Sequence, residues 1–163
     1  MLNLWLKRSW VVVKTDYEGL GTPGPHPYLV GTSEARGAAD IVTAARQLDP
    51  GIGRRWAVMG HSQGGHAALF AASLAQAWIP DLDLIGAVAI APAGSAHDMI
   101  ARLRDPRAPA TGLGFLAVAL IGAAAADRTV RLDQMLTRPA LRRSLGPTLA
   151  VSTTSLRRAR GRR

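Results

Sequence analysis

The stretch that decides the fold is Trp56-Ala57-Val58-Met59-Gly60-His61-Ser62-Gln63-Gly64. Its first four residues form a short apolar run, which is typical of a buried strand, and the alanine-rich segment after it continues to Trp78 and predicts a helix. Gly60, Ser62 and Gly64 fit the pattern Gly-x-Ser-x-Gly, in which a serine is exposed at a sharp strand-to-helix turn. We expect the two glycines to let the strand and the helix pass closely.

The serine of this turn is a candidate nucleophile. A serine hydroxyl attacks a carbonyl effectively when a base lies beside it and N–H donors meet the developing oxyanion. In a turn of this kind, the backbone N–H after the serine is one donor, and here it belongs to Gln63. His61 lies inside the turn and His66 one helical turn beyond the serine, so we expect both to have structural or surface roles.

A candidate for the catalytic base is harder to find. In hydrolases with this turn, the acid and then the histidine follow the serine along the chain. Only His97 lies beyond Ser62 and its helix, and it directly follows a strand expected at Leu84–Ala91. We therefore expect His97 to be a surface residue, and the acid and base of the triad remain unassigned.

Segments on both sides of the turn alternate between strand and helix patterns. Trp10–Lys14 and Leu84–Ala91 are short, continuous and rich in aliphatic residues, which is typical of strands in a parallel sheet. Between them, Ser33 is expected to cap a helix that runs to Leu48, with Glu34 in its first turn. Beyond residue 95 the patterns are helical, at 96–103, 113–126 and 130–136. The sequence predicts an α/β fold of parallel strands and crossover helices, followed by helical segments.

Composition and charge exclude several classes of protein. The chain has 163 residues and no cysteine, so we expect one domain without disulfides or thiolate metal sites. The net charge is +9, but basic and acidic residues balance over residues 1–127. The excess lies in a basic C-terminal end, which we expect to be disordered and not to bind nucleic acid. The N-terminal charges follow a short apolar stretch, unlike those of a signal peptide, and the apolar run at 112–126 is too short to span a bilayer.

Three motifs follow one another in the chain: Asp16-Tyr17-Glu18-Gly19-Leu20-Gly21, His26-Pro27-Tyr28-Leu29-Val30-Gly31 and the turn around Ser62. Together they resemble the secretory lipase family of α/β-hydrolases, over roughly residues 4–137. The resemblance implies a triacylglycerol lipase or carboxylesterase that cleaves lipid or short-chain esters through an acyl-serine intermediate, without a metal or an organic cofactor. Members of that family are usually secreted.

The resemblance also implies a division of the chain. Residues 1–94 correspond to the central part of the α/β-hydrolase core, residues 95–137 to a helical cap and residues 138–163 to the basic tail. The family takes its first oxyanion donor, its acid and its histidine from outside this region, so we expect an internal fragment. The family's third strand would lie between the strands at Trp10–Lys14 and Trp56–Met59. We therefore expect the chain alone to be poorly stable or to need a complementing fragment of the same fold, with little or no hydrolase activity.

A second hypothesis stays open. The chain could be a non-catalytic, truncated remnant or a binding protein that keeps the middle of the fold. In that case its arginine-rich tail would contact anionic surfaces. Turnover of a short ester that depends on Ser62 would separate the two hypotheses.

Overall fold

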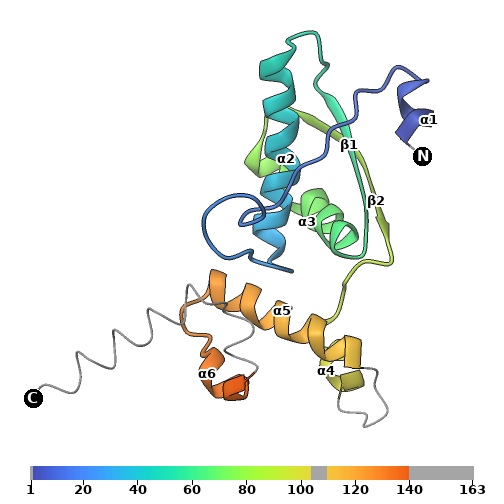
Figure 1. Ribbon diagram of the computed structural model, residues 1–163. Coiled ribbons are helices and arrows are strands. Elements are labelled where there is room, and N and C mark those ends of the chain that lie inside the picture. The colour runs from blue at the N-terminus through green and yellow to red at the C-terminus, as the bar shows by residue number, and fades with distance from the viewer. Residues whose placement is uncertain (1, 104–109, 140–163) are drawn as a thin grey trace, which may run out of the picture.

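The computed structural model describes residues 2–103 and 110–139 (Figure 1). Its elements are the helices α1 (Leu2–Leu6), α2 (Gly31–Leu48), α3 (Gln63–Trp78), α4 (Ala96–Leu103), α5 (Ala110–Ala126) and α6 (Leu132–Met135) and the strands β1 (Arg55–His61) and β2 (Asp83–Ile90). The helices expected before and after the strand at Trp56–Met59 are present as α2 and α3. Those expected beyond residue 95 are present as α4, α5 and α6, and α6 is shorter than predicted. The tail predicted at 138–163 lies outside the described residues from position 140 onward.

Among the described residues, β1 and β2 form a two-stranded parallel sheet. The register runs from Arg55 opposite Asp83 to His61 opposite Ile90, with one irregularity after Trp56. Parallel strands need a crossover connection, and α3 provides it between β1 and β2. The two apolar runs predicted as strands on either side of α3 are confirmed, and the architecture is that of a partial α/β fold.

Helix α2 begins three residues earlier than a cap at Ser33 implies. Its N-cap is Val30, whose extended backbone makes no side-chain capping bond. Ser33, the expected cap, instead lies inside the first turn and donates its hydroxyl to Glu18 Oε2 at 2.7 Å. The prediction of Ser33 as the cap is therefore wrong. Its hydroxyl bonds a carboxylate of the preceding loop instead of a free N–H of the helix.

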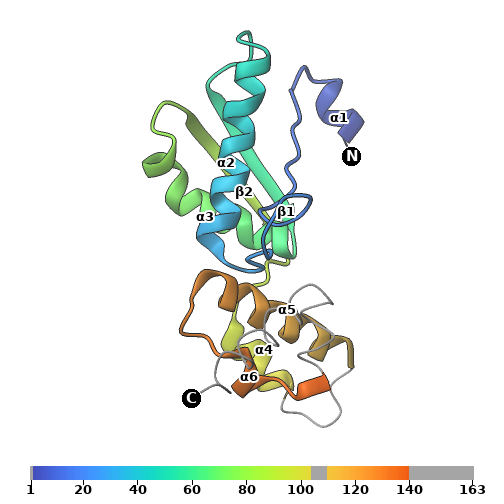
Figure 2. The ribbon, with the colours of Figure 1, turned by 60° about the vertical axis from the view of Figure 1, so that its left-hand side comes forward.

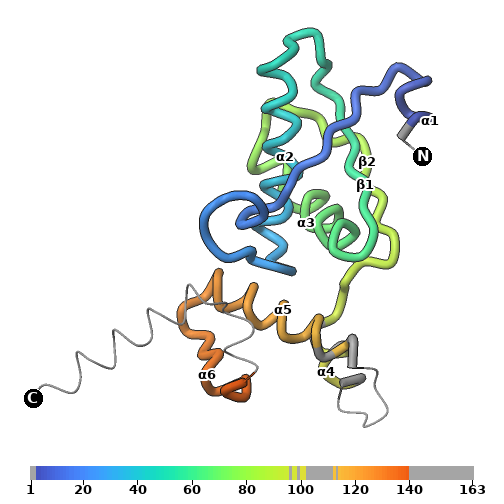
Figure 3. Tube along the Cα trace, in the orientation of Figure 1, coloured from blue at the N-terminus to red at the C-terminus, as the bar shows by residue number. Residues whose placement is uncertain are grey.

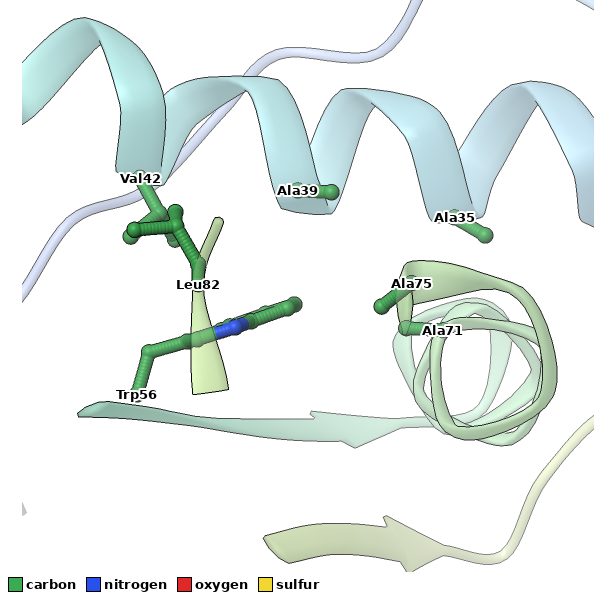
Figure 4. Close-up of a cluster of buried hydrophobic side chains, with 7 residues drawn as sticks. All are labelled: Ala35, Ala39, Val42, Trp56, Ala71, Ala75 and Leu82. Carbon is green, nitrogen blue, oxygen red and sulfur yellow. The ribbon is translucent and has the colours of Figure 1, made fainter. Parts of the chain in front are cut away.

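The core lies between α2, α3 and one face of the sheet. Alanines line the contact between the two helices, and small side chains allow their backbones to approach closely. Trp56 rises from β1 into the same layer and packs beside Val42 and Leu82 (Figure 4). The buried cluster consists of Ala35, Ala39, Val42, Trp56, Ala71, Ala75 and Leu82.

The opposite face of the sheet is open among the described residues. Met59 of β1 and Ile85, Val88 and Ile90 of β2 are each 44–46% exposed. Strands of a parallel sheet are normally covered on both faces. The described part of the chain therefore supplies only one of the two layers that such a sheet requires.

The strand predicted at Trp10–Lys14 is not formed. The segment runs without regular secondary structure from α1 to the loop beside α2 (Figure 3), and Val11 is 57% exposed. Between this segment and the free edge of β1 lies an open cavity of about 670 Å³, lined by Trp10–Lys14, by Val42 and Ala45 of α2 and by Arg55–Met59. The sequence pattern is that of a strand, but among residues 2–103 and 110–139 no strand pairs with it.

Helices α4, α5 and α6 form a separate layer beyond the end of β2 (Figure 2). Gly122 of α5 packs against the backbone of Tyr28, where an added Cβ would overlap the Tyr28 peptide. This contact docks α5 on the loop that precedes α2. None of the described helices is long and apolar enough to cross a membrane.

Candidate functional site

Ser62 lies in the turn between β1 and α3. Its backbone has φ 54° and ψ −113°, a conformation that costs a non-glycine residue about 1–3 kcal/mol. Backbone hydrogen bonds hold the turn in place: Ser62 N–H donates to Ile90 O at 3.0 Å, and Ser62 O accepts from His66 N at 3.0 Å and Ala93 N at 3.1 Å. The bonds to Ile90 and Ala93 fasten the turn to the end of β2. The Ser62 side chain is exposed.

Steric demands on the glycines around Ser62 differ from those expected. A Cβ on Gly60 would overlap the carbonyl group of Gly64, and a Cβ on Gly65 would lie 2.8 Å from Ile90 O. A Cβ on Gly64 would meet no atom within 4 Å. The close passage of strand and helix thus requires glycine at positions 60 and 65. Gly64 contributes its backbone as the surface on which Gly60 packs, and its own lack of a side chain is not required.

Behind the turn lies a buried carboxylate that sequence analysis placed only in the first turn of a helix. Glu34 of α2 is fully buried, at 0% exposure. Its Oε1 accepts hydrogen bonds from Leu29 N–H at 3.0 Å and from the Gln63 side-chain amide at 2.9 Å. Its Oε2 accepts from His66 Nδ1 at 2.6 Å. A buried charge is tolerated when its lone pairs are bonded in this way.

His26 extends this cluster into the loop before α2. Its Nδ1 lies 2.8 Å from the Glu18 carbonyl oxygen, which can only accept, so Nδ1 carries a proton. Its Nε2 lies 2.8 Å from Gln63 Nε2 and accepts the second amide hydrogen of that side chain. The bonds define a neutral His26, which stacks on Tyr17 with ring centroids 5.9 Å apart. The loop is thereby tied to the residue next to Ser62.

Two tyrosines of the same loop have perturbed acidity. Partial burial, and to a smaller extent the negative charge of Glu34, raise the pKa of Tyr17 above its ordinary value of 10.0. The same two causes, in the same order, raise the pKa of Tyr28. Both effects oppose a phenolate beside the buried carboxylate. The two hydroxyls therefore stay protonated around the cluster at neutral pH.

The structure brings together Ser62, Gln63 and His66 but forms no catalytic triad. Among the described residues, which include all four histidines, no hydrogen bond joins a histidine to the Ser62 hydroxyl. His61 is exposed at the end of β1. His97 lies on α4 with its side chain 93% exposed, 3.6 Å from Asp98. The structural role expected for His66 agrees with its bond to Glu34.

Sequence analysis missed the role of Glu34, although the pattern contained a signal. Glu34 lies four residues before Ala38 and eight before Val42, so it falls on the apolar stripe of α2. A carboxylate on such a stripe must find buried donors, and here those donors come from the loop and the turn. Its partners come from other elements, and the spacing within α2 does not identify them. Among the described residues, no group of three His, Cys, Asp or Glu side chains could hold a metal ion.

Comparison with known protein families gives a match over most of the chain. A family model described as secretory lipase matches residues 1–140. These residues include the sheet, the Ser62 turn and the helices through α6. The chain has no match among curated proteins and none among solved structures.

Proposed function

Because this chain belongs to the secretory lipase family, we propose that Ser62 is the nucleophile of a lipase or carboxylesterase that cleaves carboxylic esters of lipids. The observation that carries the proposal is the position of Ser62, exposed in a tight turn between β1 and α3. Membership of a lipase family means that the protein descends from hydrolases. The substrate class is an acylglycerol or a simpler, short-chain ester.

The proposed reaction follows the usual course of acyl transfer. Ser62 Oγ attacks the ester carbonyl carbon, and the hydroxyl proton passes to a base. The negative charge that develops on the carbonyl oxygen is stabilised by the backbone N–H of Gln63. The C–O bond to the alcohol then breaks, the alcohol leaves with the proton that the base had taken, and water hydrolyses the acyl-serine that remains. Residues 95–137, with α4, α5 and α6, are proposed to cap the acyl-binding cleft.

We further propose that the reaction needs parts of the fold beyond this chain. Two observations support this: no histidine is hydrogen-bonded to Ser62 among the described residues, and an open cavity of about 670 Å³ separates Trp10–Lys14 from the free edge of β1. A strand next to β1 would lie about 4.8 Å away, and the following strand twice as far. The proposed partner is an extended segment of the same fold that fills this cavity. The acid and the base would come from the same source.

Labelling of the serine tests the nucleophile assignment. The chain is incubated with a fluorophosphonate in concentrated imidazole buffer, which supplies the base that the described residues do not place beside Ser62, and the adduct is located by peptide mass spectrometry. We expect one adduct, on Ser62, and no adduct in Ser62→Ala. Labelling spread over several serines, or equal labelling of the alanine variant, would contradict the assignment.

A turnover assay tests the second part of the proposal. With a short p-nitrophenyl ester, the isolated chain is expected to release product no faster than its Ser62→Ala variant. Without a base beside Ser62, the acyl-enzyme forms and hydrolyses slowly. Sustained turnover that disappears in Ser62→Ala would show that the chain is complete as a catalyst.

A further inference from the structure

The buried carboxylate of Glu34 is linked to both ends of the peptide after Ser62, through Gln63 at one end and through His66 at the other. This peptide carries Ser62 C=O at one end and Gln63 N–H at the other. Glu34 Oε1 holds the Gln63 side chain at 2.9 Å. Glu34 Oε2 holds His66 Nδ1 at 2.6 Å, and the backbone N–H of the same histidine donates to Ser62 O at 3.0 Å. One side chain from α2 therefore restrains both ends of the peptide.

The Gln63 side chain is fixed because both of its amide hydrogens are used. One is donated to Glu34 Oε1 and the other to His26 Nε2 at 2.8 Å. Glu34 accepts and His26 accepts, so neither bond survives rotation of the amide by half a turn. His26 is itself held by its bond to the Glu18 carbonyl. The Gln63 side chain thus has one orientation, which restrains the movement of the backbone to which it is attached.

We propose that Glu34 is a positioning residue that orients the Gln63 N–H toward the site of the oxyanion. This inference rests on the proposed function, because it assigns a purpose to the group that would bind the oxyanion. Glu34 does not touch the substrate. It acts through Gln63 and His66, which lie between its buried carboxylate and the Ser62 turn. A donor works only when it is aimed within a few tenths of an ångström, so a rigid support behind it matters.

A purely structural role for Glu34 would be to join α2 to α3 within the core. To separate the two roles, we compare variants of Glu34 with Val42→Ala, which removes buried apolar contacts from the same helix but leaves the Glu34 hydrogen bonds intact. Glu34→Gln keeps the shape: its oxygen accepts from Leu29 and Gln63, and its amide bonds His66 Nδ1 if that histidine changes tautomer. Glu34→Asp keeps the charge but is one methylene shorter. Glu34→Ala removes all three bonds.

The first measurement is the rate of Ser62 labelling by a fluorophosphonate in the full chain. In this reaction Ser62 Oγ bonds to phosphorus, fluoride leaves, and the hydroxyl proton passes to imidazole of the buffer. The phosphoryl oxygen takes the place of the oxyanion, so the rate reports on the Gln63 N–H. We expect Glu34→Ala to be at least about tenfold slower than wild type, since loss of an oxyanion donor costs roughly 10²–10³. Val42→Ala should stay within about twofold, and Glu34→Gln should recover most of the rate.

The second measurement is the ¹⁵N NMR spectrum of the Gln63 side-chain amide, which needs no reaction. Wild type and Val42→Ala should show two separated, slowly exchanging amide protons, and Glu34→Ala and Glu34→Asp should lose them. If Glu34→Ala does not fold, both measurements are made on Glu34→Asp instead. Labelling of a folded Glu34→Ala or Glu34→Asp at the rate of Val42→Ala would overturn the proposal. So would a mobile Gln63 amide in wild type. Failure of wild-type Ser62 to react sinks the proposed nucleophile instead, and the NMR result alone then decides the role of Glu34.

Discussion

At the scale of single residues, the Ser62 turn distinguishes two glycines that the sequence motif treats alike. A methyl group on Gly60 would overlap the Gly64 carbonyl, and both partners are backbone that cannot rotate away. A methyl group on Gly64 would enter open space at the start of α3. The two glycines of the motif mark a close contact between two backbones. Only Gly60 must lack a side chain to avoid a clash there.

Alanine at these two positions should therefore have opposite effects. Gly60→Ala is expected to lower the free energy of unfolding by about 3 kcal/mol or more, because the overlap must be relieved by backbone movement. Gly64→Ala is expected to be neutral or to stabilise the chain by up to about 1 kcal/mol, because alanine favours the helix. Urea denaturation followed by circular dichroism measures both. Equal destabilisation by the two variants would contradict the steric distinction.

Some of the site was predictable at this scale, and some was not. The order strand, Ser62, helix follows from hydrophobic pattern and glycine spacing, and the strand–turn–helix order has been confirmed. The sequence pattern places Glu34 in a helix but does not show its burial, since its three donors come from the loop just before α2 and from α3. Ser33 was misplaced for a related reason: its hydroxyl bonds Glu18, fifteen residues earlier. Local propensity cannot identify such a partner.

At the scale of elements, the loop before α2 connects helix α5 to the core. Gly122 of α5 packs against the Tyr28 backbone, and the next residue, Leu29, donates its N–H to Glu34. Displacement of α5 should therefore be felt at the Ser62 turn. Gly114 lies on the same helix and has open space around it, so it provides a matched control.

Gly122→Ala is expected to release α5 from the loop. The added methyl group would overlap the Tyr28 peptide, which has no rotamer to change, whereas Gly114→Ala should leave the contact intact and favour the helix by up to about 1 kcal/mol. Hydrogen exchange measured by mass spectrometry should show faster exchange in α5 and in residues 26–30 for Gly122→Ala only. Unchanged protection in both variants would mean that α5 does not depend on this contact.

The tyrosines of the loop should make stability depend on alkaline pH. Burial first and the charge of Glu34 second raise the pKa of Tyr17 and Tyr28 in the folded chain above the ordinary 10.0. A raised folded-state pKa stabilises the folded chain fully below pH 10, and that stabilisation is lost as the pH rises through the folded value. The free energy of unfolding should fall above pH 10 more steeply in wild type than in a Tyr17→Phe, Tyr28→Phe variant. Parallel curves would contradict the perturbed acidity.

The element that failed to form is also informative. Trp10–Lys14 has the composition of a buried strand, yet it remains extended and unpaired, because strand formation depends on a neighbour as much as on sequence. The apolar runs at β1 and β2 form strands because each pairs with the other. The sequence pattern of Trp10–Lys14 predicts a strand. Because no strand in the described part of the chain pairs with the segment, it does not form one.

At the scale of the whole molecule, the described sheet exposes apolar surface in two places, at the edge of β1 and on one face. The cavity beside β1 and the open face formed by Met59, Ile85, Val88 and Ile90 leave the sheet half covered. Exposed strand edges and apolar faces favour association with another polypeptide segment. The partner proposed above, an extended segment of the same fold, would satisfy the free edge of β1.

A synthetic peptide tests whether the cavity accepts a strand. A seven-residue peptide of alternating valine and threonine, with lysine at each end for solubility, is expected to shift the fluorescence of Trp10 to shorter wavelength. It should also slow amide exchange in Val11–Val13 and in β1, because the peptide backbone would bond both. A version with a central proline lacks the needed N–H and is the control. Equal effects of the two peptides, or no protection of β1, would contradict strand insertion.

The backbone N–H of Ser62 donates to the carbonyl oxygen of Ile90, and both residues of this bond belong to the described chain. The turn between β1 and α3 is thus held to the end of β2. The surroundings of the proposed nucleophile are consequently formed by this chain alone. A complementing segment would meet a finished template, so its capture should resemble docking of a ligand into a rigid receptor, with a rate set by encounter and not by slow rearrangement of the receptor.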